Sequence, residues 1–210
     1  MPRPVISQGR SRGVSLVELM VASVIMGLVL SSALTLMFAC YRHFLDGDIA
    51  AEMNDMVLSA TTTLRRELAD GHRASSKIFN APGQPYGIVF ASARLDDQTI
   101  DFDDVNLQPI WQKWVCYYLE PDDHDFLLIR KEAPLLSPTT TPPLVPADRD
   151  TSYFKTLDGG RVVARGVVEF KLEDGHPLKL GLTCRQVGHR GTSTESEFLQ
   201  EIATQVTFRN

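Results

Sequence analysis

The chain has 210 residues, of which 43% are hydrophobic, 22% charged and 8% aromatic. This composition fits a globular protein of one domain or two small ones, and it excludes a collagen-like chain, a low-complexity disordered chain and a polytopic membrane protein. The 21 basic and 26 acidic residues give a formal net charge of −5, so no nucleic-acid partner is expected. The three cysteines form no C-x-x-C pair, which leaves no zinc or thioredoxin-like motif.

Residues 1–13 form a basic segment whose only charged side chains are Arg3, Arg10 and Arg12. Without these three, 18 of the 21 basic residues face 26 acidic ones, and the net charge is −8. The 21 residues from Leu19 to Ala39 are uncharged. At about 1.5 Å per residue they can cross a ~30 Å hydrocarbon layer as one helix. Because the arginines precede this helix, the positive-inside rule predicts a cytoplasmic N-terminus and an external remainder.

Two other export signals fit this segment less well. A cleaved secretory signal has an apolar core of about 7–15 residues, and this core is longer. A lipoprotein signal that ends at Cys40 requires small residues before the cysteine, where this chain has Phe38. Cys40 is therefore interpreted as a small apolar residue at the membrane exit.

Glu18 is the only acidic residue in the apolar run from Gly13 to Cys40. A carboxylate in the hydrocarbon region costs on the order of 2.5–3.5 kcal/mol and normally has a partner or a function. One interpretation is that Glu18 lies shallowly, at the level of the lipid headgroups. The other is that it pairs with a free α-amino group, which cleavage after Gly13 would create on the helix of a neighbouring subunit.

The segment from Arg12 to Ala22, RGVSLVELMVA, resembles the class III signal of type IV pilins and of the pseudopilins of type II secretion. In that family a prepilin peptidase removes the basic leader after the glycine, and the new N-terminus is methylated. The resemblance implies cleavage between Gly13 and Val14, methylation of Val14, and an assembly role for Glu18. The chain has Val14 where the family usually has phenylalanine.

Beyond the membrane segment, apolar residues recur every three or four positions from Phe44 to Leu68, which predicts an amphipathic helix. One helix is therefore expected from Val14 to about Asp70, with Gly71 as its end. We divide the chain into a leader (1–13), a membrane and assembly helix (14–40), the amphipathic outer half of the helix (41–71) and a β head (72–210).

Short apolar runs in the head predict strands, and two turns rich in Gly, Pro and Asp, residues 120–125 and 173–177, predict hairpins. A long surface loop is expected over Ala133–Asp150, which contains five prolines. The predicted strands are Tyr86–Ser92, Ile110–Leu119, Phe126–Arg130, Arg161–Leu172, Leu178–Val187 and Phe198–Phe208. The expected fold class is α+β, a long N-terminal helix packed against an antiparallel sheet.

Parts of the head also resemble the minor pseudopilin J class and the related minor pilin W class, namely LRREL at residues 64–68, the strand pair around residues 114–130, the hairpin over 167–182 and the closing VTFRN. This resemblance implies a structural subunit at the tip of a type II secretion pseudopilus. Its partners would be I-like and K-like tip subunits, the major subunit, prepilin peptidase and the inner-membrane assembly platform. The head would be periplasmic, on a single-pass inner-membrane helix.

Two alternatives stay open. The first is a minor pilin of a type IV pilus, with a role in assembly priming, adhesion or DNA uptake. The second is a membrane-anchored binding module or hydrolase that shares only the signal. The sequence contains no G-x-S-x-G elbow, P-loop or G-x-G-x-x-G pattern, and we predict no enzymatic activity and no cofactor.

Two further site hypotheses concern the head. Asp101, Asp103 and Asp104, with Asp96 and Asp97 nearby, could offer oxygen ligands to calcium, although the D-x-D-x-D-G spacing is missing and a solvated face is favoured. Cys116 and Cys184 both lie in predicted strands and could form a disulfide if their Cα atoms approach within about 7 Å.

Overall fold

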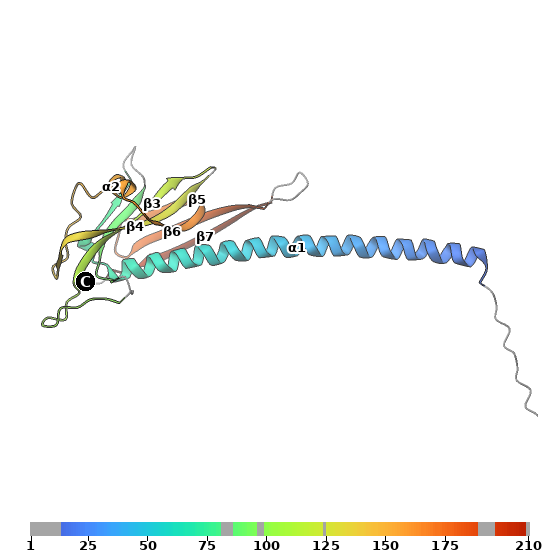
Figure 1. Ribbon diagram of the computed structural model, residues 1–210, viewed down its shortest axis with the longest axis horizontal. Helices are drawn as coiled ribbons and strands as arrows, with labels where there is room; N and C mark the ends of the chain where they lie inside the picture. The colour runs from blue at the N-terminus through green and yellow to red at the C-terminus, as the bar shows by residue number, and fades with distance from the viewer. Residues whose placement is uncertain (1–13, 81–85, 96–98, 124, 189–195, 209–210) are drawn as a thin grey trace, which may run out of the picture. The chain divides into compact units, whose positions relative to one another are not determined.

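The computed structural model describes residues 14–80, 86–95, 99–123, 125–188 and 196–208. It contains the long helix α1 (Leu16–Asp70), a 3-10 turn (Arg73–Ser75), the short helix α2 (Thr151–Thr156) and one antiparallel sheet (Figure 1). The chain divides into two compact units, residues 1–47 and 48–210. The predicted α+β fold, a long helix packed against an antiparallel sheet, is confirmed.

Helix α1 begins two residues later than expected and ends where the sequence predicts. At its end the backbone N–H of Gly71 donates to the Leu68 carbonyl over 3.0 Å. Gly71 fits this end closely, since a Cβ there would lie 3.1 Å from the same carbonyl oxygen. A side chain at this position would require the Leu68 carbonyl to shift by a few tenths of an ångström.

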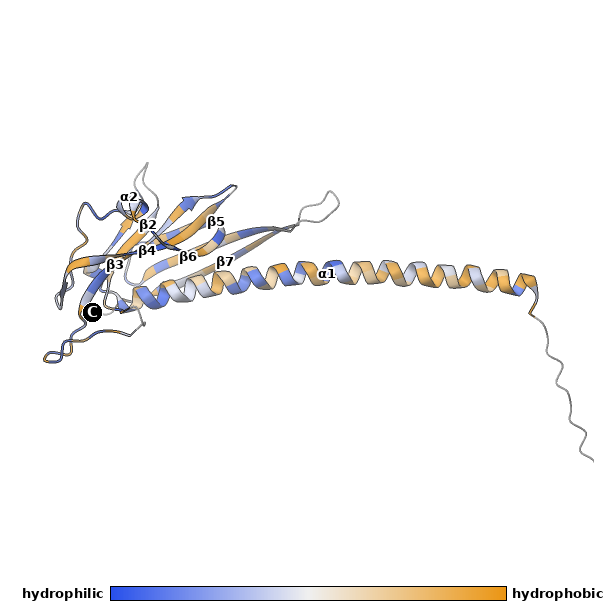
Figure 2. Cartoon of the chain, in the orientation of Figure 1, coloured by the Kyte–Doolittle hydropathy of each residue, from blue (hydrophilic) through white to orange (hydrophobic). Residues whose placement is uncertain are grey.

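Within the first unit, the part of α1 from Leu19 to Ala39 has no charged residue and is predominantly apolar on all sides (Figure 2). The large apolar side chains of this unit, from Leu16 to Phe44, are about half exposed or more, because no residue that the structure describes covers them. Among the described residues α1 is the one helix long and apolar enough to cross a membrane. A helix that is apolar on all sides and uncovered needs an apolar environment from outside the chain.

The sheet is a seven-stranded antiparallel meander in which every strand pairs with its neighbours in sequence. All six predicted strands are present, and the two predicted hairpins turn between Pro121 and Phe126 and between Glu173 and Leu178. The first turn is shorter than expected, because Glu120 and Pro121 belong to β3 and pair with β4. The strands are β1 (Ser76–Phe79), β2 (Gly87–Ser92), β3 (Trp111–Pro121), β4 (Phe126–Thr139), β5 (Arg161–Glu173), β6 (Leu178–Gly188) and β7 (Ser196–Val206).

The expected loop over Ala133–Asp150 is partly wrong, because β4 continues to Thr139. Ala133 pairs with Trp114 and Pro134 with Lys113, and the register then shifts before Thr139 pairs with Trp111. Proline lacks an N–H donor and is tolerated in a strand beside such an irregularity. Strand β1 and helix α2, which are only four and six residues long, were not predicted from the sequence.

One face of the sheet packs on the second-unit part of α1. The helix contributes an apolar stripe at intervals of three and four residues, which matches the predicted amphipathic face from Met53 onward. Strands from β2 to β7 supply the other side of this core, so the whole meander depends on the one helix. The stripe consists of Met53, Val57, Ala60, Leu64 and Leu68.

The other face of β1–β4 carries a second buried cluster. Trp111, Trp114 and Tyr118 from β3 pack there with Phe154 of α2, which is fully buried. The side chain of Asp150 caps α2 by accepting from the Tyr153 N–H over 2.8 Å. Strands β2 and β3 are therefore covered on both faces, and all six residues of β2 are buried.

A polar network joins α1 to the sheet inside this core. The Glu67 carboxylate, 5% exposed, accepts from the Tyr117 hydroxyl over 2.8 Å and from Arg130 Nε over 3.0 Å. Arg130 also pairs with Glu132 at 2.5 Å, and Glu132 with Lys113 at 2.8 Å. Burial, reinforced by the charge of Glu67, raises the pKa of the Tyr117 hydroxyl.

The same network changes the titration of Glu132. Burial disfavours its charged form, but hydrogen bonds from Lys113 and Arg130 outweigh burial and lower the carboxyl pKa. A lowered pKa means that the ionised carboxylate stabilises the fold above its unfolded-state pKa. That contribution is lost as the pH falls through the lower folded-state value.

We predict that Glu67→Ala lowers the free energy of unfolding by about 3 kcal/mol, because Arg130 and Tyr117 lose their buried acceptor. Glu52→Ala, at an exposed position of the same helix, should change it by less than about 0.5 kcal/mol. Urea unfolding of the full chain in detergent, followed by the fluorescence of Trp111 and Trp114, measures both values. Equal stabilities of the two variants would contradict a role for Glu67 in holding the helix to the sheet.

Candidate functional site

The first turn of α1 is closed by a reciprocal pair of hydrogen bonds. The backbone N–H of Ser15 donates to Glu18 Oε2 over 2.9 Å, and the N–H of Glu18 donates to Ser15 Oγ over 3.2 Å. The Ser15 carbonyl accepts the first helical hydrogen bond, from Leu19, over 3.1 Å. This is a capping box, S-x-x-E, which satisfies two of the backbone donors that a helix start leaves free.

The capping box holds the Glu18 carboxylate at the backbone of Ser15, one residue from Val14. A carboxylate is also favoured there because the N-terminal end of a helix carries a partial positive charge. Val14 is 70% exposed, so nothing described in the chain covers the residue that would become the new N-terminus. The arrangement presents one negative charge beside Val14 on an otherwise apolar surface.

Sequence reasoning identified Glu18 and Val14 but missed Ser15. The signal was present, because a serine followed three residues later by glutamate, just before an apolar run, is the signature of a capping box. Gly13 and the rest of the leader lie outside the described residues.

The proposed disulfide between Cys116 and Cys184 is wrong, because both thiols are free in the structure. Cys116 lies in β3 and Cys184 in β6, with β4 and β5 between them. Three strand spacings of about 4.8 Å separate β3 from β6 by about 14 Å. A disulfide needs Cα atoms within about 7 Å. Burial raises the pKa of both thiols, that of Cys184 to about 12, so they are unreactive packing residues.

Cys40 lies on α1 and is exposed within the chain. It belongs to the apolar first-unit segment, as expected from the sequence.

In the acidic loop before β3, the described carboxylates of Asp101, Asp103 and Asp104 do not converge on one point. Asp101 accepts a 2.5 Å hydrogen bond from the Gln112 side chain, and Asp103 accepts from the backbone and side chain of Asn106 within its own turn. Asp104 is exposed, and Asp96 and Asp97 lie outside the described residues. Within the described ranges no group of three or more acidic, histidine or cysteine side chains could hold a metal ion.

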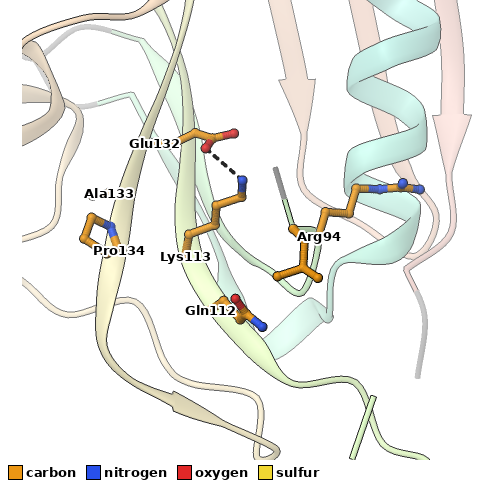
Figure 3. A pocket seen from close by; sticks show the side chains of 7 residues that line it. Arg94, Gln112, Lys113, Glu132, Ala133 and Pro134 are labelled. Atoms are coloured by element: carbon orange, nitrogen blue, oxygen red, sulfur yellow. Dashed lines mark ion pairs between the residues drawn. The ribbon is translucent and has the colours of Figure 1, made fainter. Parts of the chain in front are cut away.

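A pocket of about 300 Å³ beside β3 and β4 brings together Arg94, Gln112, Lys113 and Glu132 (Figure 3). Its charges already have partners in the fold. Lys113 pairs with Glu132 at 2.8 Å, and Arg94 donates to Asp70 of α1 over 2.9 Å. The pocket is therefore explained as part of the polar contacts that surround the helix end.

Comparison with known proteins identifies one match. Residues 9–34 match the family model described as the prokaryotic N-terminal methylation motif. The match contains Gly13, Val14, Ser15 and Glu18, and it supports a type IV pilin-like protein of the kind that prepilin peptidase processes. No curated protein and no solved structure matches the chain.

For the acidic loop we expect no calcium binding, since Asp101 and Asp103 are engaged in hydrogen bonds and calcium requires about 6–8 oxygen ligands. Calorimetric titration of the full chain in detergent with calcium chloride should show only heat of dilution. A saturable heat that Asp103→Asn abolishes would contradict this expectation.

Proposed function

We propose that the chain is the precursor of a structural pilin-like subunit, which prepilin peptidase cleaves between Gly13 and Val14 and which is then methylated at Val14. The observation that carries the proposal is the Glu18 carboxylate, held by hydrogen bonds one residue from Val14 within a segment that matches the methylation motif. Helix α1 anchors the precursor in the inner membrane. The arginines of the leader favour a cytoplasmic N-terminus and a periplasmic head.

Glu18 acts as the assembly residue in this proposal. Cleavage creates an α-amino group at Val14, and the carboxylate pairs with that group on its own chain or on a neighbouring subunit. Pairing offsets the cost of keeping the carboxylate in an apolar environment, whereas removal of one partner of a buried ion pair costs about 3–5 kcal/mol. The pairing therefore favours helices that lie together over a helix alone in the bilayer.

Within the pilin-like proteins we propose a minor pseudopilin of the J class, at the tip of a type II secretion pseudopilus. The support is the resemblance of the head, together with a helix that packs under an antiparallel meander. The partners are then I-like and K-like tip subunits, the major subunit and the assembly platform. A minor pilin of the W class, which primes a type IV pilus, is the alternative that shares these features.

The proposed role is structural, without enzymatic activity or a cofactor. The pocket in Figure 3 supports this view, because its Arg94, Lys113 and Glu132 side chains are engaged in ion pairs. A catalytic group is normally kept available for substrate.

The two tasks of Glu18 can be separated by substitution. Glu18→Gln keeps an oxygen acceptor for the capping box but removes the charge, whereas Ser15→Ala weakens the box and keeps the charge. We predict that both variants are cleaved, that Glu18→Gln loses co-purification with the I-like and K-like subunits at least tenfold, and that Ser15→Ala retains it. The measurement is the amount of each partner recovered with the full chain from membranes of cells that carry the secretion genes.

Normal assembly of Glu18→Gln would show that the charge is not needed and would refute the pairing mechanism. Recovery of type IV pilus subunits in place of the I-like and K-like subunits would favour the alternative class.

A further inference from the structure

A second pocket, of about 280 Å³, opens between the second-unit part of α1 and strands β4 and β5. Three guanidinium groups line it: Arg66 from the helix, Arg130 from β4 and Arg161 from β5. The hydroxyl side chains of Thr63 and Ser59, one and two turns before Arg66, complete its polar wall. We call this site the arginine pocket.

The fold neutralises only one of these three cations. Arg130 pairs with Glu67 at 3.0 Å and with Glu132 at 2.5 Å. Arg66 and Arg161 make no ion pair with any residue that the structure describes. Since Glu67, the one acidic residue in the lining, is already paired with Arg130, the pocket keeps two uncompensated positive charges. This excess is unusual in a chain whose net charge without the leader is −8.

The sheet also places two of the arginines directly opposite each other. Arg130 and Arg161 are register partners on adjacent strands, where facing Cβ atoms are about 4.5–5.5 Å apart. Like charges in this position destabilise a sheet. Attachment of the helix explains Arg130, through Glu67, but it leaves Arg161 without a role in the fold.

The exposed acidic residues that precede Arg66 on the same helix are too far away to fill the pocket, and Asp70, one turn after Arg66, accepts from Arg94. Asp48, Glu52 and Asp55 are exposed, and their spacing puts them on the same side of α1 as Arg66. The nearest of these three, Asp55, precedes Arg66 by 11 residues, or about 16 Å along the axis, whereas an ion pair needs about 4 Å. Among the described residues no carboxylate is thus paired with Arg66 or Arg161, which leaves both available to a carboxylate of another molecule.

We propose that the arginine pocket binds an aspartate or glutamate side chain on the outer helix of a neighbouring, different pilin-like subunit. This inference rests on the proposed function, because assembly of pilin-like helices supplies the neighbour. A guanidinium group presents donors in a planar fork that matches a carboxylate, and two such groups on different elements fix its position.

The test uses the full chain in cells that carry the secretion or pilus genes. Ser59, an exposed residue of the pocket wall, is replaced by the photo-crosslinking residue p-benzoylphenylalanine, and the crosslinked peptides are identified by mass spectrometry. We expect a crosslink to the helix of another pilin-like subunit, within one turn of an Asp or Glu. Arg66→Glu combined with Arg161→Glu should reduce its yield about five- to tenfold, since each exposed ion pair contributes a factor of up to about five.

Matched controls separate the pocket from general charge effects. Arg65→Glu, the adjacent helix residue, and Arg165→Glu, on the same strand as Arg161, reverse exposed charges outside the pocket and should leave the yield unchanged. The variants are first checked for cleavage of the leader and for protease resistance of the head. If the double reversal fails this check, Arg161→Gln alone replaces it and should reduce the yield by at least twofold.

The proposal is overturned if the yield is the same with and without the arginines, or if the crosslink goes to phospholipid, to a segment without acidic residues or to a second copy of this chain. A chain that is cleaved and recovered with pilin-like partners but gives no crosslink at Ser59 refutes the arginine pocket alone. A chain that is neither cleaved nor recovered with such partners refutes the proposed function as well.

Discussion

The structure depends on one constraint: the apolar residues of a single helix must be covered in two different environments. In its first part the helix is apolar on all sides, and no side chain of the described residues covers it. From Met53 to Leu68 the apolar residues narrow to a single stripe, which the sheet buries. Burying a side chain such as Leu64 or Leu68 contributes about 1.5–3 kcal/mol, so the head requires the second part of the helix. The first part has no apolar partner among the residues that the structure describes.

One glutamate lies near the start of the apolar segment and another near the end of the buried stripe. Glu18 stands at the start of the apolar segment, where the capping box stabilises the first turn and holds the carboxylate near Val14. Glu67 stands near the end of the buried stripe, where Tyr117 and Arg130 satisfy it. Both carboxylates accept hydrogen bonds, but Glu67 has a cationic partner within the chain and Glu18 has none that the structure describes. This difference is the physical reason to seek the partner of Glu18 in another group or another subunit.

Much of the fold could be predicted from the sequence, because the spacing of apolar residues and the residues that favour turns are local features of the chain. The helix and the six longer strands follow from spacing, and Gly71 and the two polar turns mark their ends. The extension of β4 through Pro134 could not be foreseen, since proline normally argues against a strand and only the facing residues of β3 make it favourable. The short elements β1 and α2 are defined by what they pack against, and their own sequences carry little signal.

The candidate sites also differ in whether their residues are close together or far apart in the sequence. The capping box lies within four residues, and the sequence contained it. The positions of Cys116 and Cys184 and the meeting of Arg66, Arg130 and Arg161 depend on the order and register of strands far apart in the chain. Spacing along the sequence gives no information on such contacts, so the sequence left the Cys116–Cys184 disulfide open, and the arginine pocket was not anticipated.

If the chain is the pilin-like precursor that we propose, the N-terminus of the mature protein is fixed by the cleavage between Gly13 and Val14. The direct measurement is the intact mass and N-terminal sequence of the protein isolated from cells that make prepilin peptidase. A chain that begins at Val14 and carries one methyl group on its α-amino nitrogen is the predicted result. A chain that keeps residues 1–13, or one cleaved at another position such as before Cys40, would contradict the claim.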